Sequence, residues 1–172
     1  MQKYRLVPHP DFPPLAVTGV EVSLTRHDGR HWSLDYAVDG TGELVVPHPA
    51  APERTDELWK HTCFELFVAG DAGYVEFNLS PSTGWAAYRF DGYRKGGRDL
   101  PLDSEPQVTR RADGVGAQLL LPALSGVNWR VALTSVIEET GGRISYWSLA
   151  HPRSKPDFHD PACFVLQLPA AG

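Results

Sequence analysis

Short stretches of alternating or continuous hydrophobic residues recur along the whole chain, and Val, Leu, Phe, Tyr and Trp dominate them. No stretch keeps the 3.6-residue period of an amphipathic helix, although APERTDELWKHT could hold one helical turn. The pattern therefore predicts about eleven β-strands and little helix. The expected strands are residues 20–24, 32–38, 43–46, 63–69, 74–80, 85–90, 106–111, 116–122, 129–138, 144–150 and 163–168.

Turn sequences separate the expected strands. HDGRH, DGTGE, AGDAG and ETGGR combine Gly with Asp, Ser, Thr or other polar residues, which favours tight hairpin connections. Hairpins join antiparallel strands, so the sequence predicts an all-β, antiparallel β-sandwich. The segment 91–105 has the weakest pattern and is expected to be a long loop. Since neither a linker nor a repeat interrupts the pattern, we expect one domain over residues 1–172.

Strand phase brings polar residues onto one face of the predicted sheet. Successive side chains of a strand point to opposite faces, so Glu65 in CFELFV, and Glu76 and Asn78 in YVEFNLS, point away from the apolar face. In WAAYRF, either Arg89 or Tyr88 could join them. A solvated face with cross-strand ion pairs is the ordinary interpretation. Aromatic rings beside amides, carboxylates and guanidinium groups are also what a sugar site requires.

The five tryptophans differ in their expected environment. Trp32 and Trp129 begin regular strands and are expected in the core. Trp59 and Trp85 lie next to turns and polar groups, which favours partial exposure and a platform for a ligand. Trp147 fits either environment, because it shares its phase with Leu149 and His151.

A histidine-rich segment, WSLAHPRSKPDFHDPACF, lies near the C-terminus. His151, Lys155, Asp157 and His159 offer metal-ligand chemistry, but their spacing matches no compact zinc signature. We expect a stiff, proline-containing loop that completes the rim of a binding site and holds no metal.

Catalysis has little support in the sequence. Cys63 and Cys163 begin apolar runs and are expected to be reduced, buried and inert. His61 lies two residues before Cys63, so a Cys-His nucleophile pair is an alternative, although nothing supplies the positive setting of a thiolate. No G-x-S-x-G elbow is present, so no catalytic residue is predicted.

Composition limits the possible partners. The net charge is −5, from 21 acidic and 16 basic residues that are scattered without a basic run, so nucleic acid is not an expected partner. No segment has the length of a membrane span, and the first residues lack the apolar region of a signal peptide. We expect a cytoplasmic protein without membrane contact.

Two long strings, LWKHTCFELFVAGDAGYVEFNLSPSTGWAAYRFDGYR and YWSLAHPRSKPDFHDPACFVLQL, carry a resemblance over residues 58–168. This region resembles uncharacterised bacterial proteins of the DOMON-like superfamily, which are related to family 9 carbohydrate-binding modules. The resemblance implies a jelly-roll β-sandwich with a ligand site on one sheet face and its rim loops. It implies sugar as the ligand of the modules and haem as the ligand of some DOMON domains. Met1 is the only methionine, so a haem iron would need two histidines, for example His61 and His151.

Together these observations predict a non-catalytic domain that binds a small carbohydrate or sugar-containing metabolite, as a monomer or weak dimer and without a cofactor. Two alternatives stay open: a protein-interaction module, which would show an open patch and no deep pocket, and a haem-binding DOMON domain. The predicted ligand-binding residues are Trp59, Glu65, Glu76, Asn78, Trp85, Arg89, Trp147, His151, Lys155, Asp157 and His159.

Overall fold

Twelve antiparallel β-strands and four 3₁₀ helices make up the computed structural model of the chain, which describes residues 1–170. The strands are β1 (Gln2–Pro8), β2 (Gly19–Arg26), β3 (His31–Asp39), β4 (Cys63–Gly70), β5 (Gly73–Leu79), β6 (Trp85–Phe90), β7 (Arg98–Asp99), β8 (Gln107–Arg110), β9 (Gly114–Leu120), β10 (Asn128–Glu139), β11 (Arg143–Ser148) and β12 (Leu166–Pro169). The 3₁₀ helices are η1 (Thr41–Glu43), η2 (Leu58–Lys60), η3 (Thr140–Gly142) and η4 (Pro161–Cys163).

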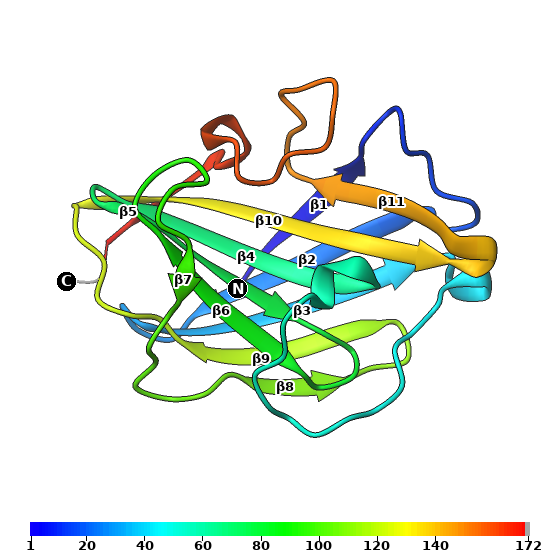
Figure 1. Cartoon of the computed structure of the whole chain (residues 1–172), viewed down its shortest axis with the longest axis horizontal. Helices are drawn as coiled ribbons and strands as arrows, with labels where there is room; N and C mark the ends of the chain where they lie inside the picture. The colour runs from blue at the N-terminus through cyan, green and yellow to red at the C-terminus, as the bar shows by residue number, and fades with distance from the viewer. Residues whose placement is uncertain (171–172) are drawn as a thin grey trace.

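The strands form two layers that β1 connects (Figure 1). The first layer has the order β1-β2-β3-β9-β8, and the second has the order β7-β6-β5-β4-β10-β11 with β12 beside β10. Residues 2–6 of β1 pair with β2, whereas Val7 and Pro8 pair with β11, so one strand passes from the first layer to the second. The prediction of an all-β, antiparallel sandwich is confirmed.

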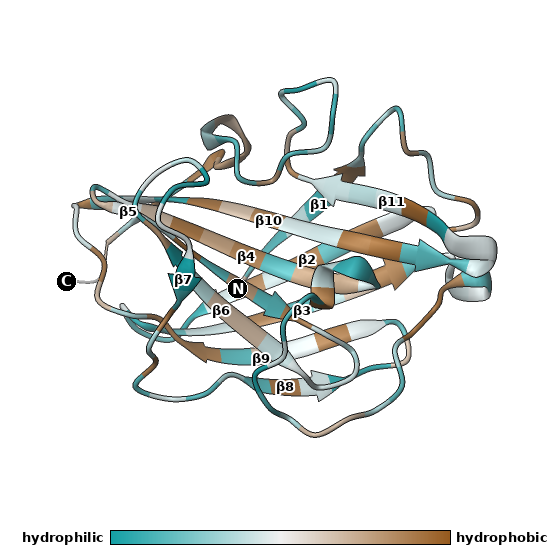
Figure 2. Ribbon diagram, in the orientation of Figure 1, coloured by the Kyte–Doolittle hydropathy of each residue, from teal (hydrophilic) through white to brown (hydrophobic). Residues whose placement is uncertain are grey.

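The main hydrophobic core lies between the two layers and takes residues from both. Trp32 of β3 packs against Trp129 of β10, with ring centroids 6.2 Å apart. Tyr36 of β3 places its ring 5.0 Å from that of Phe64, and its hydroxyl donates a 2.6 Å hydrogen bond to the Glu65 carbonyl of β4. Hydrophobic segments accordingly occur on strands of both layers (Figure 2). The two tryptophans expected in the core, Trp32 and Trp129, are fully buried.

The β4–β5 hairpin sets the register of the second layer. Gly70 pairs with Gly73, and Gly73 has a φ of 94°, a conformation that favours glycine. A Cβ at this position would lie 2.1 Å from the Phe90 carbonyl oxygen of the neighbouring strand. The turn residues therefore bring Glu65 opposite Asn78 in the ladder.

Some predicted elements differ from the structure. Residues 43–46 are not a strand: η1 ends at Glu43, and Leu44 makes only an isolated bridge to Glu139. The last strand begins at Leu166, because residues 161–163 form η4. β1 was not predicted, since its sequence QKYRLVP is mostly polar, and the two-residue β7 lies inside the expected long loop. The expected helical turn before Cys63 is present as η2.

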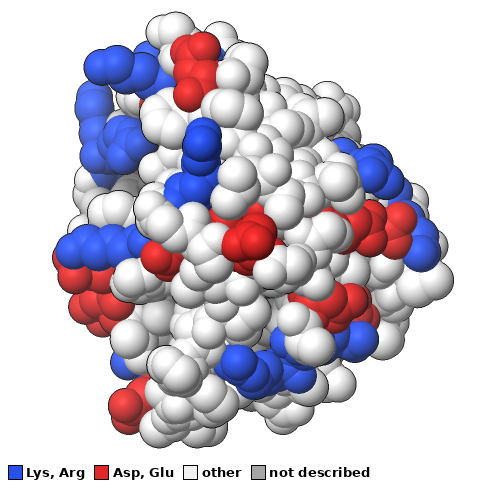
Figure 3. All heavy atoms as spheres, turned by 90° about the vertical axis from the view of Figure 1, so that its right-hand side faces the viewer, with Lys and Arg blue, Asp and Glu red and all other residues white. Residues whose placement is uncertain are grey.

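Charged side chains form small groups of both signs on the face of the molecule shown in Figure 3. Charged side chains of opposite sign pair locally, for example Lys60 with Glu57 at 2.7 Å. Within residues 1–170, no helix is long and apolar enough to cross a membrane.

Candidate functional site

The second layer has an outer face, opposite the main core, that is also largely covered. Along β4 every residue from Cys63 to Ala69 is buried, so both faces of this strand are shielded from solvent. Phe64 belongs to the main core, whereas Phe67 belongs to a second hydrophobic cluster on the outer face. Glu65 has the phase of Phe67 and therefore lies on the outer face. Glu76 is paired with Phe67 and lies there too.

The segment between β11 and β12, residues 149–165, covers one part of this outer face and is called the C-terminal loop (Figure 1). Its Phe164 packs on Phe67, with ring centroids 5.8 Å apart. Asp160 caps η4 by accepting a 2.8 Å hydrogen bond from the Ala162 amide, and the Arg153 guanidinium donates to its other oxygen. These contacts hold the loop in a defined conformation against the sheet.

A second covering segment, residues 9–18 between β1 and β2, is called the N-terminal loop. The fully buried carboxylate of Glu139 accepts hydrogen bonds from three of its backbone amides, those of Leu15, Ala16 and Val17, at 2.6, 2.6 and 2.9 Å. The loop places Phe12 edge-to-face on Tyr146 of β11, with centroids 5.1 Å apart. One carboxylate thus fixes the segment that delivers an aromatic ring to the outer face.

Between these two loops and the sheet lies a pocket of about 720 Å³, called the outer-face pocket. Its volume is in the range of small-molecule sites, roughly 300–1,000 Å³. Six aromatic rings, two carboxyl groups from the sheet and a set of charged loop residues converge on it. The lining residues are Phe12, Trp59, Glu65, Glu76, Tyr88, Phe90, Arg94, Val136, Tyr146, Lys155, Pro156, Asp157, Phe158 and His159.

Glu65 is the more deeply buried of the two sheet carboxyl groups. Its Oε2 accepts a 3.0 Å hydrogen bond from the Thr134 hydroxyl of β10. Burial raises the pKa of Glu65 well above its usual range, and the nearby Glu76 carboxyl raises it further.

Glu76 lies on β5, is only 6% exposed and lines the outer-face pocket. Burial raises its pKa to about 7, although the adjacent Asn78 amide and the positive charge of Arg94 both favour the ionised form. No hydrogen bond of good geometry links Asn78 to it. His159 Nε2 is 3.7 Å from Glu76 Oε2, and its Nδ1 is 2.7 Å from the Tyr74 hydroxyl. Burial, with a smaller effect of Arg94, lowers the pKa of His159 to about 4, so His159 is neutral at pH 7.

An ion pair closes the pocket on the loop side. Arg94 Nη2, from the segment after β6, lies 2.8 Å from Asp157 Oδ1 of the C-terminal loop, and the Tyr93 hydroxyl donates to Oδ2. The backbone amide of Arg94 also donates a 3.3 Å hydrogen bond to Tyr74. On the opposite side, the Tyr88 hydroxyl donates to Asp56 at 2.7 Å. These bonds orient the rings and charges before any ligand arrives.

Six of the eleven predicted site residues line the outer-face pocket, although they come from three separate parts of the chain. Trp59, in η2, is 50% exposed at the pocket, as expected for a platform. Lys155, also exposed, lies at the rim. The six residues are Trp59, Glu65, Glu76, Lys155, Asp157 and His159.

The other five predicted residues do not line the pocket. Trp85 and Trp147 are each only 2% exposed and belong to the main core, which corrects the expectation that Trp85 is partly exposed. Arg89 pairs with Val75 and so shares the opposite sheet face, because cross-strand partners point the same way. His151 bonds to the Val7 carbonyl at 2.8 Å. Asn78 is fully buried beneath the outer face, without a hydrogen-bond partner.

Several lining residues were not predicted from the sequence. Tyr88 was considered only as an alternative to Arg89, and its pairing with Glu76 decides between them. Phe90 and Tyr146 could have been found from strand phase, because each lies an even number of residues along its strand from another outward-facing residue. Phe12 and Arg94 lie in loops, where no sequence periodicity reports which side chain turns inward.

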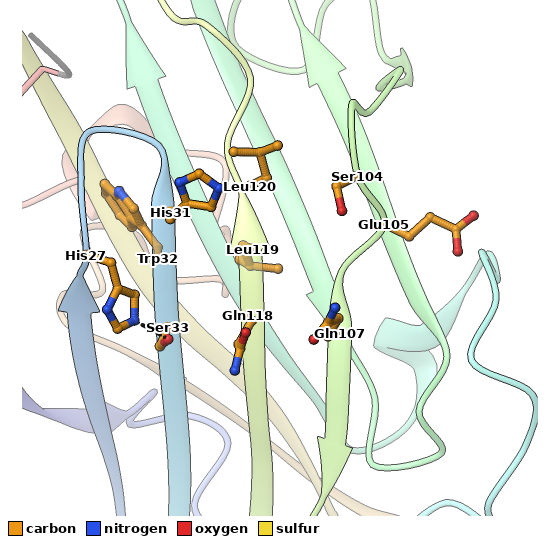
Figure 4. A pocket seen from close by; sticks show the side chains of 10 residues that line it. All are labelled: His27, His31, Trp32, Ser33, Ser104, Glu105, Gln107, Gln118, Leu119 and Leu120. Carbon is orange, nitrogen blue, oxygen red and sulfur yellow. Dashed lines mark hydrogen bonds between the residues drawn. The ribbon is translucent and has the colours of Figure 1, made fainter.

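A second, smaller hollow of about 140 Å³ lies on the first layer (Figure 4). His27, from the end of the β2 region, points toward Ser33 with Nε2 2.7 Å from its hydroxyl, and His31 Nδ1 is 2.6 Å from Asp28. Glu105 and Gln107 lie at its other side. The volume is below that of typical ligand sites.

The residues considered for catalysis and haem are placed elsewhere. Cys63 is fully buried, and burial together with the Glu65 charge raises the pKa of its thiol well above the usual value, the opposite of an activated nucleophile. Cys63 and Cys163 are both free thiols. His61 bonds Glu138 at 2.7 Å on the surface, and neither His61 nor His151 lines the pocket. Within residues 1–170, no group of three or more metal-ligating side chains is gathered for an ion.

The fold and the pocket define an antiparallel β-sandwich with an aromatic and acidic cavity on one outer face. Its structure is similar to that of a "putative carbohydrate-binding protein" from Bacteroides uniformis, with a TM-score of 0.71 and 16% sequence identity. The similarity covers 98% of this chain and 86% of that protein, and at this identity it shows a shared fold. No protein-family model and no curated protein matches the sequence.

Proposed function

We propose that the protein binds a small carbohydrate, or a metabolite that contains a sugar, in the outer-face pocket without chemically changing it. The observation that carries this proposal is the convergence of six aromatic rings with hydrogen-bonding groups in a cavity of about 720 Å³. Rings cover the apolar C–H faces of a pyranose, while carboxyl, guanidinium and hydroxyl groups bond to its hydroxyls.

The arrangement of the walls supports this function. Trp59 and Tyr88 present rings from η2 and β6, and Phe158 comes from the C-terminal loop, so a flat ligand meets apolar surface on more than one side. Glu65 and Glu76 supply oxygens at the floor. The structural neighbour from Bacteroides uniformis is described as carbohydrate-binding, which is consistent with the same use of this fold.

A wider family relationship is part of the proposal. The long strings around Trp59 and the C-terminal loop resemble DOMON-like proteins and family 9 carbohydrate-binding modules, and an antiparallel sandwich with an outer-face site is what that resemblance implies. The pocket favours a small ligand over the interaction-module alternative, which requires an open patch.

Binding can be tested by titrating the protein with glucose, galactose, mannose, xylose and cellobiose, followed by calorimetry and tryptophan fluorescence. Trp59 is half exposed at the pocket, whereas the other four tryptophans are at most 2% exposed, so a fluorescence change reports on Trp59. We expect saturable binding of at least one sugar, with a dissociation constant on the order of micromolar to millimolar.

Two variants locate the site. Trp59→Ala is expected to weaken binding about tenfold, which corresponds to about 1.4 kcal/mol of lost contact. Tyr4→Ala, an aromatic truncation in the first layer outside the pocket, is the matched control and leaves the affinity unchanged. If a bound sugar kept its full affinity in Trp59→Ala, or if no sugar bound at all, the proposal would be overturned.

A further inference from the structure

The floor of the outer-face pocket carries two carboxyl groups that have few partners in the protein. The Asn78 amide lies near Glu76 and favours its ionised form, but no hydrogen bond of good geometry joins the two. A basic group close to Glu76, His159 Nε2, is 3.7 Å away. Glu65 has one donor, the Thr134 hydroxyl at 3.0 Å. Both side chains are more than nine-tenths buried and line the cavity. Buried carboxyl groups normally have partners, so their open positions indicate a ligand that supplies donors.

The basic residues of the pocket do not neutralise this pair. The Arg94 guanidinium forms an ion pair with Asp157 at 2.8 Å, and this pair at the wall has no net charge. Lys155 is exposed at the rim and makes no ion pair in the described part of the chain. Two acidic groups thus remain at the floor, without a matching positive charge.

The walls around the acidic pair present aromatic faces. Tyr88 and Phe90 come from β6, Tyr146 from β11 and Trp59 from η2. A cation that lies against such faces is attracted by the ring quadrupoles, most strongly where water is excluded. The acidic floor and the aromatic walls therefore both favour a positively charged group on a ligand.

We propose that the outer-face pocket recognises a protonated amino group on a sugar-sized ligand, such as an amino sugar, with its ammonium between Glu65 and Glu76. This inference rests on the proposed function, since it names the class of carbohydrate that the same pocket takes. The ammonium supplies three N–H donors to carboxyl oxygens that lack them, and the sugar ring packs on the aromatic walls.

The energetic argument follows from burial. In the free protein, burial raises the pKa of Glu76 to about 7 and that of Glu65 above its usual range. An ammonium between them favours the ionised carboxylates, so its binding near pH 7 releases protons to the buffer. The titratable or charged groups around Glu76 from the neighbouring elements are Glu65, Tyr74, Tyr88, Arg94, Asp157 and His159.

The decisive experiment compares glucosamine, N-acetylglucosamine and glucose by calorimetry at about pH 7, in two buffers with different ionisation enthalpies. N-acetylation removes the charge while keeping the sugar. We expect glucosamine to bind at least about tenfold more tightly than the two neutral sugars, with release of protons on binding. At about pH 5.5 the preference for glucosamine becomes smaller, because Glu76 is then largely protonated.

A conservative variant tests whether the acidic floor of the pocket causes the preference for glucosamine. Glu76→Gln keeps the shape of the side chain and removes its charge, so it is expected to weaken glucosamine binding more than glucose binding and to remove most of the proton release. Glu65→Gln is the second variant, should Glu76→Gln fold poorly. Glu105→Gln, an exposed substitution on the first layer, is the control and preserves both.

The outcomes separate this inference from the proposed function. Equal or tighter binding of glucose, with no proton release, overturns the amine inference and leaves sugar binding intact. Cyclohexylamine and cyclohexanol serve as non-sugar probes with and without an amine. Binding of cyclohexylamine alone supports the amine recognition and overturns the sugar function, and binding of none of these compounds overturns both.

Discussion

The two faces of the β10-β4-β5 region differ in composition while both are buried. The inner face carries Phe64, Leu66 and Phe77, which pack against the first layer in the main core. The outer face carries Glu65 and Glu76 among aromatic rings, beneath the two covering loops. The same backbone therefore supports a close-packed interior on one side and a polar cavity on the other. The comparison shows that burial alone does not identify a core, because the second buried face is arranged around a space.

The largest expected effect of a single substitution belongs to the inner face. Phe77→Ala removes a fully buried ring from the main core and is expected to lower the free energy of unfolding by about 3–5 kcal/mol. Denaturant unfolding measures this loss. A loss below about 1 kcal/mol would mean that the inner face tolerates a cavity as the outer face does, and would remove the contrast between them.

The next effect concerns how the outer face is covered. Glu139→Gln replaces a carboxylate that accepts three backbone N–H hydrogen bonds with a neutral amide. The NH₂ group of that amide then faces those donors. We expect a loss of about 2–4 kcal/mol in unfolding free energy, together with weaker ligand binding because Phe12 loses its position. Glu138→Gln, at the adjacent position and bonded to surface His61, is the control with a small effect on both. Unchanged binding in a folded Glu139→Gln variant would show that the N-terminal loop is not needed for the pocket.

The pH dependence of stability distinguishes the outer face from the inner one, which has no titrating side chains of this kind. The folded-state pKa of Glu76 is raised from 4.5 to about 7, so its folded form favours the neutral acid, and its contribution is present below pH 4.5 and lost as pH rises to about 7. The Glu76 contribution to the free energy of unfolding is on the order of 3 kcal/mol. His159 has a pKa lowered from 6.5 to about 4, so its contribution is present above pH 6.5 and lost as pH falls to about 4. These two slopes oppose each other in the wild-type protein.

Variants separate the two slopes. Glu76→Gln is expected to make the slope of stability against pH more positive than in the wild type between about pH 4.5 and 7, because the opposing Glu76 contribution is removed while those of His159 and Glu65 remain. His159→Asn is expected to make stability fall over the same interval. Unfolding free energies from denaturant titrations at several pH values test this. Identical profiles for wild type and Glu76→Gln would show that the carboxyl group is not buried in solution.

The smallest expected effect on stability is that of Trp59→Ala. Trp59 is half exposed in η2, and its ring has no place in the main core, so the free energy of unfolding should change by less than about 1 kcal/mol. Thermal unfolding measures this change. A loss as large as that of Phe77→Ala would mean that the Trp59 ring is structural, and its role as a ligand platform would need revision.

The fold was predictable from the sequence because strand patterns are local. Alternation in YVEFNLS and the Gly-rich turns indicated an antiparallel sheet, and the same alternation placed Glu65, Glu76 and Asn78 on one face. β1 was missed because its polar sequence contributes few side chains to the core, with Leu6 its only buried residue. The predicted strand at residues 43–46 was wrong because Gly40, with a φ of 78°, caps a 3₁₀ turn that takes the place of a strand.

The pocket was less predictable because it depends on tertiary contacts. The sequence suggested a solvated polar face, whereas the loops bury it and thereby shift the pKa of Glu76 and His159. Trp85 was expected beside the ligand because it adjoins a turn, but its strand phase directs it into the main core. No local pattern connects Phe12 with Tyr146, which meet only because Glu139 holds the N-terminal loop.

The two covering loops have a consequence for when the site can form during synthesis. Phe12 comes from the beginning of the chain, and Asp157 and His159 come from near its end, yet all three line one cavity. During translation the strands of the sheet emerge before the C-terminal loop does, since chains fold as they leave the ribosome from the N-terminal side. A nascent or truncated chain that stops after β11 therefore lacks a wall of the site, and ligand binding requires synthesis through the C-terminal loop.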